Sequence, residues 1–356
     1  MSGIEVTYVL GTRPELIRSA PILKELGGNP LISLTVVNTG QHFDHNMSQG
    51  FLDYFDLPTA DLSLGIGGKP RAEQVVDIIG SLVPVFRSHP QTCVCVFGDT
   101  NSCLGAALAA QMCEIPVVHI EAGARSYDMT LPEEVNRRII DHIADLLLTV
   151  SPRCTEQLRS EAVPGAVVET GDPLYETLMA ALGARGIERS GKDRRRCLLT
   201  LHRQALVDSP DALLRQLIVI DDAAGELGLR VLFPVHPRAA RTVAGAVLEH
   251  IELMEPLLYE QMVMTLALSC LVVTDSGGLQ KEAFWTGTPC VTVRHSTEWG
   301  ETVESGYNVL ATGLDVGAAM SSMVEKVLDI PSGKEDPFLG VGASRRIADA
   351  IEGRYG

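Results

Sequence analysis

The stretch CVCVFGDTNSCLGAALAAQMCEIPVVHIEAG, residues 93–123, decides the fold class. It begins with the apolar run 93–97, continues with an alanine-rich helical pattern and closes on a second apolar run, 116–120. Two short apolar runs joined by a helix are typical of parallel strands buried on both faces of a sheet. An acidic residue follows each run, Asp99 after the first and Glu121 after the second.

The same alternation of strand and helix continues along the chain. Short apolar runs predict strands at residues 6–10, 34–39, 93–97, 116–120, 146–150, 197–201, 231–235, 271–274, 290–293 and 309–311. Helical patterns lie between them, at 14–26, 72–87, 102–113, 132–145, 210–227, 239–248, 259–269, 278–286 and 316–328. This order predicts an α/β fold with two doubly wound, Rossmann-like parallel sheets.

The alternation is interrupted at 165–171 and in the polar run 183–196, which indicates a boundary region. A length of 356 residues also suggests two domains. We expect an N-terminal domain over 1–170 and a C-terminal domain over 171–340, facing each other across a central crevice. The segment 341–356 is expected to form a helix that could pack back on the N-terminal domain.

Composition and charge argue against several classes of protein. The formal net charge of −16 disfavours binding along a nucleic-acid backbone. The sequence has no apolar stretch of about 18 residues, so no membrane span is expected. The opening residues MSGIEV, 1–6, show no leader pattern, which favours a cytoplasmic protein. Eight cysteines are scattered without a C-x-x-C pair, as expected for reduced, buried thiols.

Three acidic residues, Asp99, Glu121 and Glu133, follow predicted strands or open a predicted helix. The carboxyl ends of the strands in an open α/β sheet form the ligand crevice. Carboxylates gathered there raise one another's pKa, which is how proton-transfer sites are built. A structural interpretation stays open, because Glu133 would also suit the dipole at a helix start and Asp99 could cap the following helix.

Two loops could bind a phosphate group. GTRPE at 11–15 follows the first strand and opens a helix, so Arg13 and the helix N-terminus could bind an anion, although a plain turn is an equal alternative. DSGGLQKE at 275–282 repeats this arrangement with two glycines, and Glu282 could accept hydrogen bonds from ribose hydroxyls. Neither loop is a G-x-G-x-x-G or Walker motif, so neither a dinucleotide cofactor nor ATP hydrolysis is indicated.

Two histidines, His202 and His236, end predicted strands in the second half of the chain. Each has a basic residue close behind it, and for each a catalytic and a structural role stay equally open. No H-E-x-x-H pattern or similar ligand spacing occurs, so a bound metal is not expected.

Eight motifs resemble, in order, those of one enzyme family. They are GTRPE at 11–15, TGQH at 39–42, GDTNS at 98–102, HIEAG at 119–123, PEEVNR at 132–137, FPVHPR at 233–238, DSGGLQKEA at 275–283, and TEW at 297–299 with ESG at 304–306. From about residue 6 to residue 310, the chain resembles the non-hydrolysing UDP-N-acetylglucosamine 2-epimerases.

The resemblance implies a fold like that of GT-B glycosyltransferases, with UDP held mainly by the C-terminal domain. It also implies a homodimer that acts on a UDP-sugar without a metal or a nicotinamide cofactor. The implied catalytic group is Asp99, Glu121, Glu133 and His202. The residues implied to bind the substrate or UDP are Arg13, Gln41, His42, His236, Ser276, Gly277, Gly278, Glu282 and Arg294.

Two departures from the family pattern and one further likeness matter. HRQALVD at 202–208 lacks the glutamate that commonly follows His-Arg, and Arg18 stands where many members carry lysine. Because Gln41 and His202 lie in a region that helps to bind a second, activating UDP-sugar in bacterial members, an allosteric site is left open. ARSYD at 124–128 also resembles relatives that epimerise a UDP-linked 2,3-diacetamido uronic acid.

The chemistry of the sugar favours elimination and re-addition. The C2 hydrogen of UDP-GlcNAc is not next to a carbonyl, so its direct removal and return would be too slow. Loss of UDP together with the C2 proton gives a 2-acetamidoglucal, and re-addition with protonation of the other face gives UDP-ManNAc. Alternatives left open are an epimerase of a related UDP-sugar, a hydrolysing 2-epimerase, a GT-B glycosyltransferase and a non-enzymatic UDP-sugar sensor.

Overall fold

The structure is a computed structural model that describes residues 3–42, 59–183, 191–203, 206, 209–235, 237–243, 245–326, 328–331 and 335–356. The chain divides into two compact units. Unit 1 is Met1–Thr177 together with Asp336–Gly356, and unit 2 is Leu178–Glu335. The chain leaves unit 1 within helix α7 (Leu174–Leu182), beyond the boundary expected at 170, and returns to it before residue 340.

Unit 1 contains a seven-stranded parallel sheet with the order β3-β2-β1-β4-β5-β6-β7. Its strands are β1 (Ile4–Thr12), β2 (Ile32–His42), β3 (Leu62–Ser63), β4 (Cys93–Phe97), β5 (Val117–Ala122), β6 (Leu146–Thr149) and β7 (Ala166–Glu169). Every residue of β4 is buried, because helices cover the sheet on both faces. Its unbroken apolar sequence follows from this position.

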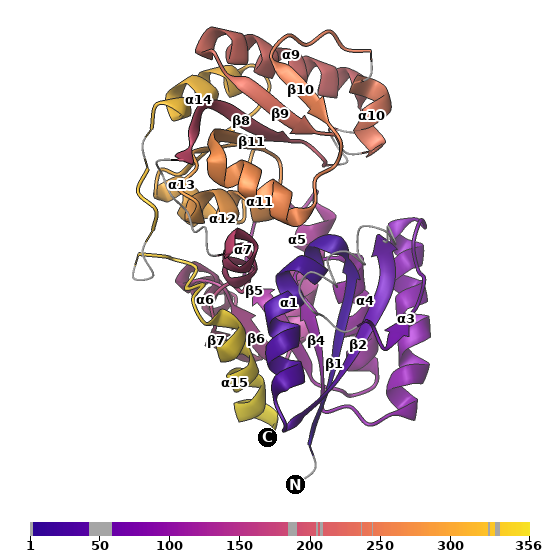
Figure 1. Cartoon of the computed structure of the whole chain (residues 1–356). Helices are drawn as coiled ribbons and strands as arrows, with labels where there is room; N and C mark the ends of the chain where they lie inside the picture. The colour runs from indigo at the N-terminus through magenta and orange to yellow at the C-terminus, as the bar shows by residue number, and fades with distance from the viewer. Residues whose placement is uncertain are drawn as a thin grey trace. The chain divides into compact units, whose positions relative to one another are not determined.

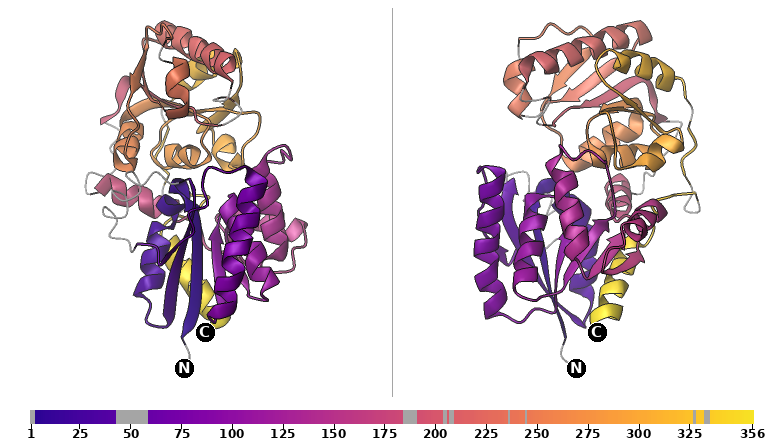
Figure 2. Two further views of the ribbon diagram at one scale, coloured as in Figure 1. Left: turned by 90° about the vertical axis from the view of Figure 1, so that its right-hand side faces the viewer. Right: turned by 180° about the vertical axis from the view of Figure 1, so that it is seen from behind.

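The helices of unit 1 form a layer on each side of its sheet, as Figures 1 and 2 show. On one side α1 packs against the C-terminal helix α15, and Asn29 Nδ2 donates to Glu352 Oε2 at 2.9 Å. On the other side α3, α4 and α5 pack next to one another and bury apolar side chains such as Ile78 and Ile140 against the strands. The helices are α1 (Arg13–Gly28), α3 (Arg71–Ser88), α4 (Asn101–Met112), α5 (Pro132–Ile143), α6 (Pro152–Ser160) and α15 (Ala343–Tyr355).

Unit 2 contains a six-stranded parallel sheet with the order β10-β9-β8-β11-β12-β13. Its strands are β8 (Asp193–Thr200), β9 (Arg230–Pro234), β10 (Ile251–Met254), β11 (Ser269–Thr274), β12 (Cys290–Val293) and β13 (Asn308–Ala311). Helices α9 and α14 pack on one face, and α11 and α12 on the other (Figure 1). The helices are α9 (Pro210–Leu227), α10 (Pro237–Val243), α11 (Tyr259–Leu268), α12 (Gly277–Trp285), α13 (Gly300–Glu304) and α14 (Asp315–Val324).

Each sheet has one point at which the strand order reverses. β1 lies between β2 and β4 in unit 1, and β8 lies between β9 and β11 in unit 2. In open α/β sheets, ligands bind beyond the carboxyl ends of the strands at such a switch point. The ends of β1 and β4, and those of β8 and β11, are therefore the places where functional side chains are expected.

Several short elements differ from the sequence-based expectations. β7 occupies residues that were expected to form a domain boundary. It is an edge strand whose side chains alternate between exposed and partly buried, so its sequence has no buried apolar run. The sequence also does not predict β3, β10, α6, α7 or α13, which are short. The helix expected at 239–248 is α10, which begins at Pro237 and ends at Val243.

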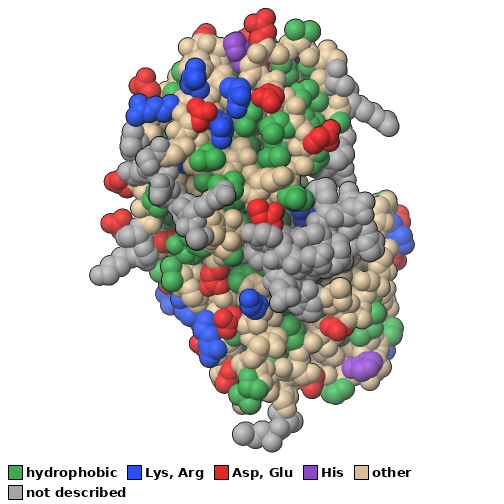
Figure 3. Space-filling view, viewed as in Figure 1, with side chains coloured by type: hydrophobic (Ala, Val, Ile, Leu, Met, Phe, Trp, Pro, Cys, Tyr) green, Lys and Arg blue, Asp and Glu red, His purple; other side chains and the backbone are tan. Residues whose placement is uncertain are grey.

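The surface carries both signs of charge. Figure 3 shows basic and acidic side chains interspersed on one face, in a chain whose formal net charge is −16. Within the described ranges, no helix has the length and apolar character needed to span a bilayer. All eight cysteines are free thiols, as expected, and most of them are buried.

Candidate active site

Glu121 occupies an unusual backbone position at the end of β5. It is the extra residue of a β-bulge, because β5 advances from Ile120 to Ala122 while β6 advances only from Leu148 to Thr149. Its φ of +68° lies in the left-handed region, which is uncommon for residues other than glycine. Bulges re-aim side chains and recur next to active sites. The backbone therefore sets the direction of the Glu121 side chain.

Arg18 of α1 forms an ion pair with Glu121. Arg18 Nη1 lies 2.9 Å from Oε1 and 3.0 Å from Oε2 of Glu121, whose exposed fraction is 2%. The guanidinium also lies over the ring of Phe97, 4.8 Å from its centroid. Burial by itself lowers the pKa of Arg18, but the charges of Glu121 and Asp99 outweigh burial and raise the pKa above its usual range.

Asp99, just past the end of β4, lies beside a second arginine. Its Oδ2 accepts a hydrogen bond from Arg137 Nη2 of α5. Its backbone carbonyl oxygen accepts one from Asn136 Nδ2 at 2.8 Å. Burial raises the pKa of Asp99, and the charges of Glu121 and Glu133 raise it further against the opposing charges of two arginines. A carboxyl group with a raised pKa is suited to proton transfer near neutral pH.

Glu133 and Glu134 are adjacent in the first turn of α5 but differ in environment. Glu133 is exposed. Glu134 is buried, and its Oε2 accepts hydrogen bonds from the amide and hydroxyl of Ser126 at 2.8 and 3.0 Å. It also pairs with Arg137 at 3.2 Å and with Arg138 at 3.0 Å. Glu134 thus ties the preceding loop to α5, whereas Glu133 is accessible to a ligand.

The GTRPE loop between β1 and α1 is closed by a capping box. Thr12 Oγ1 accepts from the Glu15 amide at 3.4 Å, and Glu15 Oε2 accepts from the amides of Gly11 and Thr12 at 2.8 and 2.7 Å. Thr100 Oγ1 also donates to Glu15 Oε1 at 2.5 Å. The backbone amides of Gly11, Thr12 and Glu15 therefore have hydrogen-bond partners within the protein. Arg13, whose side chain is partly exposed, is the charged residue of this loop that could contact an anion.

Gln41 holds the start of α4. Its Oε1 accepts from the amide and the hydroxyl of Ser102 at 3.0 and 2.7 Å, and the residue is 8% exposed. β1 approaches so closely here that a Cβ on Gly11 would lie 2.0 Å from Ser102 Oγ. His42, the next predicted binding residue, is described by its backbone alone, at the end of β2.

His202 and Asp275 meet at the switch point of unit 2. His202 Nδ1 lies 2.8 Å from Asp275 Oδ1, and Asp275 Oδ2 accepts from the amides of His202 and Arg203 at 2.9 and 2.8 Å. Burial lowers the pKa of His202, but the hydrogen bond and charge of Asp275 outweigh it and raise that pKa. Burial raises the pKa of Asp275, but His202 and the backbone amides bring it below its usual value. With 49% of the His202 side chain exposed, the imidazole can meet a ligand.

The N-terminus of α12 lies at the same switch point and has no side-chain cap. Ser276 is the N-cap residue, yet its hydroxyl does not bond to the helix. Ser276, Gly277 and Gly278 are partly exposed. Without a cap, amide groups at a helix N-terminus can bind an anion such as phosphate. Gly277 is close to Trp299, whose Nε1 would lie 3.4 Å from a Cβ at that position.

Glu282 and Arg294 are both buried and bonded within unit 2. Tyr259 Oη donates to Glu282 Oε1 at 2.7 Å. Arg294 binds Glu298 through two contacts, Nη1 to Oε2 at 2.8 Å and Nη2 to Oε1 at 2.9 Å. His236, also predicted to bind substrate, lies outside the described residues.

The partners of the predicted residues do not follow from sequence reasoning. Asp275 and Arg137 stand inside motifs quoted above, but nothing in the sequence pairs Asp275 with His202 or Arg137 with Asp99. Those pairings depend on which strands and helices are neighbours. The motifs themselves are the signal that could have drawn attention to the two residues.

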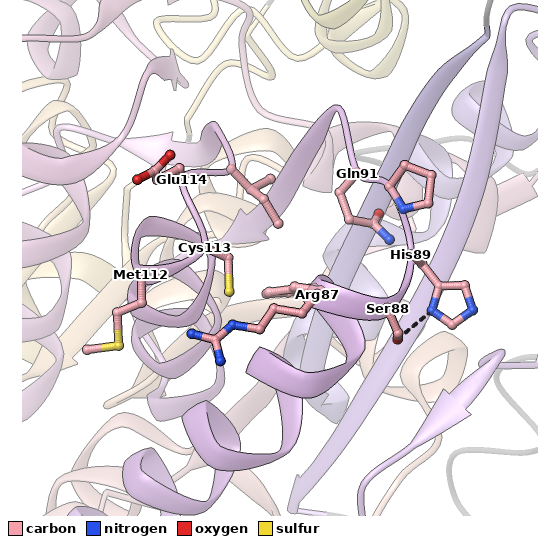
Figure 4. A pocket seen from close by; sticks show the side chains of 10 residues that line it. Arg87, Ser88, His89, Gln91, Met112, Cys113 and Glu114 are labelled. Carbon is pink, nitrogen blue, oxygen red and sulfur yellow. Dashed lines mark hydrogen bonds between the residues drawn. The ribbon is translucent and has the colours of Figure 1, made fainter.

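A separate hollow of about 470 Å³ lies in unit 1 (Figure 4). It is lined by residues that precede β4 and β5, including His89, Gln91, Cys113 and Glu114, and Ser88 Oγ lies 2.9 Å from His89 Nδ1. It is therefore at the amino ends of these strands, and none of the predicted site residues line it. Across the described ranges, no group of three or more His, Cys, Asp or Glu side chains is placed to hold a metal ion.

Comparison with known proteins gives consistent results. Residues 24–352 match the family model described as UDP-N-acetylglucosamine 2-epimerase. The chain is 35% identical to UDP-2,3-diacetamido-2,3-dideoxy-D-glucuronate 2-epimerase of Pseudomonas aeruginosa, over 90% of this chain and 91% of that protein. These matches extend through both units.

Solved structures agree with this assignment. UDP-GlcNAc 2-epimerase of Methanocaldococcus jannaschii, in complex with UDP-GlcNAc and UDP, has a TM-score of 0.89 at 29% identity, over 99% of this chain and 100% of that chain. The Neisseria meningitidis enzyme bound to UDP-GlcNAc has a TM-score of 0.86 at 28% identity, over 98% and 100%. The predicted GT-B-like fold with two parallel-sheet α/β domains is confirmed. The chain belongs to the UDP-N-acetylglucosamine 2-epimerase family.

Proposed function

We propose that this protein inverts C2 of a UDP-linked N-acetylhexosamine and interconverts UDP-GlcNAc and UDP-ManNAc. A base removes the C2 proton while the C1–O bond breaks, so UDP leaves with the electron pair of that bond and a C1=C2 double bond forms. UDP then adds back to C1 while an acid delivers a proton to the opposite face of C2. No net oxidation occurs, and the atoms of the substrate are conserved in the product.

The environment of Asp99 is the observation that carries this proposal. The Asp99 carboxyl group is 17% exposed and contacts Arg137, and desolvation together with the charges of Glu121 and Glu133 raises its pKa. The reaction needs groups that can take up and release a proton on both faces of C2. Asp99, Glu121 and Glu133 supply three carboxyl groups for that task, and Arg18 keeps the Glu121 carboxylate in place.

The leaving UDP requires groups that stabilise the charge of its diphosphate. We assign this task to the uncapped N-terminus of α12, with Ser276 and Gly277, and to Arg13. His202, whose pKa is raised by Asp275, carries positive charge over a wider pH range than an ordinary histidine. It would donate a hydrogen bond as negative charge develops on the phosphate oxygen.

A related substrate is the second candidate. The Pseudomonas aeruginosa relative is a UDP-2,3-diacetamido-2,3-dideoxy-D-glucuronate 2-epimerase, so the same inversion at C2 can be tested on that sugar. Parallel assays with both UDP-sugars give the ratio of kcat/KM values. A higher kcat/KM for the uronate would replace UDP-GlcNAc in the proposal and leave the elimination chemistry unchanged.

Product analysis by NMR tests the proposed reaction. Incubation with UDP-GlcNAc should yield UDP-ManNAc until equilibrium. Free ManNAc and UDP would instead identify a hydrolysing enzyme, a requirement for an acceptor would identify a glycosyltransferase, and bound but unchanged UDP-GlcNAc would identify a sensor.

A pair of matched variants tests the role of the acidic residues in the same assay. Glu133→Gln should lower kcat by about 10²–10⁴-fold if Glu133 transfers a proton. Glu73→Gln is the control, because Glu73 is likewise an exposed glutamate in the first turn of a helix in unit 1, and it should retain the wild-type rate. A loss below about tenfold in Glu133→Gln would remove that residue from the proton-transfer set.

A further inference from the structure

His119 lies in a buried polar network beneath the ends of β4 and β5. It is fully buried, and both of its ring nitrogens are within hydrogen-bond distance of oxygen atoms. Nδ1 lies 2.7 Å from Asp141 Oδ1, and Nε2 lies 2.8 Å from the carbonyl oxygen of Gly98. The proposed reaction does not use His119, yet a fully buried imidazole with two polar contacts is costly to place unless both contacts are made.

Both ring nitrogens of His119 face oxygen atoms that can accept a hydrogen bond. A carbonyl oxygen can only accept a hydrogen bond, so Nε2 must carry a proton. Asp141 Oδ2 faces the Arg125 guanidinium at 2.7 Å and the Gly123 amide at 3.2 Å, as the acceptor oxygen of a carboxylate does. Nδ1 of His119 therefore also faces an acceptor, Asp141 Oδ1.

The groups around His119 form a network of ion pairs. Arg125 Nη1 lies 2.7 Å from Asp141 Oδ2, and the same guanidinium binds Glu161 through Nε at 3.0 Å and Nη2 at 2.7 Å. Arg125 thus bridges two carboxylates, Asp141 and Glu161, and His119 lies against the first of them. A buried ion pair is tolerated when its hydrogen bonds are satisfied, as those of Asp141 are here.

The network ends at the backbone beside Asp99 and Glu121. Gly98, whose carbonyl accepts from His119, directly precedes Asp99 and has a φ of +87°. Asp141 Oδ2 accepts at 3.2 Å from the amide of Gly123, two residues after Glu121. Gly123 itself has no room for a side chain, because a Cβ there would lie 2.3 Å from the carbonyl oxygen of Cys154.

We propose that His119 is a positioning residue. In its doubly protonated form it donates one hydrogen bond to the Gly98 carbonyl oxygen and one to Asp141, and these two bonds hold the backbone next to Asp99 in place. This inference rests on the proposed function, because it assigns His119 a task in the proton transfer by Asp99. His119 itself does not touch the substrate. Displacing a reacting group by about 1 Å can lower a rate by up to about 100-fold, so the effect on kcat should be large.

Two substitutions separate the two contacts of the ring. Glutamine at 119 places its amide near the position of Nε2, so His119→Gln can still donate to Gly98. Asparagine places its amide near Nδ1, so His119→Asn can still donate to Asp141 but releases Gly98. We expect His119→Asn to lower kcat by about 10–100-fold and His119→Gln to lower it less than tenfold, both with unchanged KM.

The kinetic isotope effect distinguishes positioning from a merely structural role. With substrate deuterated at C2, His119→Asn should show a larger isotope effect on kcat than the wild type, because proton transfer becomes slower relative to the other steps. Loss of stability alone would reduce the active fraction and leave the isotope effect unchanged. Equal losses in the two variants with an unchanged isotope effect, or a kcat of His119→Asn within about threefold of the wild type, would overturn the inference.

A spectroscopic measurement tests the protonation state without any substrate. In ¹⁵N-histidine-labelled wild-type protein at neutral pH, the signals that vanish in His119→Gln should show a proton on each ring nitrogen. A neutral ring with one bare nitrogen would overturn the inference even if the enzyme is active. A wild-type protein that leaves both UDP-sugars unchanged would refute the proposed function itself, whereas a fully active wild type with failed His119 predictions refutes only the role of His119.

Discussion

Replacing Asp275 with asparagine isolates the electrostatic part of the His202 site. Asp275 is 1% exposed, and its carboxylate faces the His202 ring at 2.8 Å and the amides of His202 and Arg203 at 2.9 and 2.8 Å. Asparagine has nearly the same shape but only one acceptor oxygen, and its NH₂ group would face a donor. The variant therefore removes charge and leaves a buried donor unsatisfied.

The expected cost follows from these contacts. A buried donor without an acceptor costs about 1–3 kcal/mol. The pair with His202 contributes about 1 kcal/mol at most, because the His202 side chain is 49% exposed and solvent screens the interaction. Together these terms predict that the free energy of unfolding of unit 2 falls by about 2–4 kcal/mol near pH 6.

The pH dependence has a definite sign. The pKa of His202 is raised on folding, so its contribution is fully present below the unfolded pKa of about 6.5 and is lost as the pH rises through the folded value. The pKa of Asp275 is lowered, so its contribution is present above about pH 4 and is lost as the pH falls. The cost of the substitution should therefore be smaller near pH 9 than near pH 6, by about 1 kcal/mol.

Urea denaturation followed by tryptophan fluorescence measures this difference. Both tryptophans of the chain, Trp285 and Trp299, lie in unit 2, so the signal reports on that unit. Asp211→Asn is the matched control, since Asp211 is an exposed acid in the first turn of α9 and should cost a few tenths of a kcal/mol. Equal costs of Asp275→Asn at the two pH values, or a cost below about 0.5 kcal/mol near pH 6, would refute the reasoning.

Two further predictions concern unit 1. Gly123→Ala should destabilise the protein by about 2–5 kcal/mol, because φ is +82° and the new Cβ would meet the Cys154 carbonyl oxygen at 2.3 Å. Gly80→Ala lies in helix α3 with nothing within 4 Å of the new Cβ, so it should instead stabilise the protein by about 0.5–1 kcal/mol. Urea titrations followed by circular dichroism measure the free energy of unfolding of both variants. Similar effects of the two substitutions would contradict the packing argument. Arg137→Met should raise the pKa of Asp99 further, because a charge that lowers it is lost. In the direction of the reaction in which Asp99 removes the proton, the acidic limb of the pH–kcat profile of Arg137→Met should move to higher pH. Arg137→Lys retains the positive charge and should keep the wild-type limb. An unmoved limb in Arg137→Met would show that the ionisation of Asp99 does not cause that limb.

Much of the fold can be predicted from the sequence, because buried parallel strands form short apolar runs. β4, β11 and β12 coincide with such runs. The elements that sequence reasoning misses are short or lie at a sheet edge. β7 and β10 are edge strands that have no neighbouring strand on one side, and several of their side chains are exposed, so their sequences contain no continuous apolar run. Their formation is decided by pairing with a neighbouring strand, which is a tertiary effect.

The candidate site is predictable in part for the same reason. Asp99 and Glu121 are conspicuous because an acid directly after a buried strand stands at the ligand edge of the sheet. The ion pair of Glu121 joins residues 103 positions apart and follows only from the order of the strands. The bulge that re-aims Glu121 depends on register with β6, which no local pattern reveals. Gln41 was predicted to bind substrate, and its carbonyl holds Ser102 at the start of α4.

Deuterium incorporation at C2 tests the central claim most directly. The enzyme is incubated with UDP-GlcNAc in D₂O, and the product is examined by NMR as it first appears. Elimination and re-addition through Asp99, Glu121 and Glu133 predict UDP-ManNAc that carries solvent deuterium at C2. Epimerised product that retains its original C2 hydrogen would contradict the account.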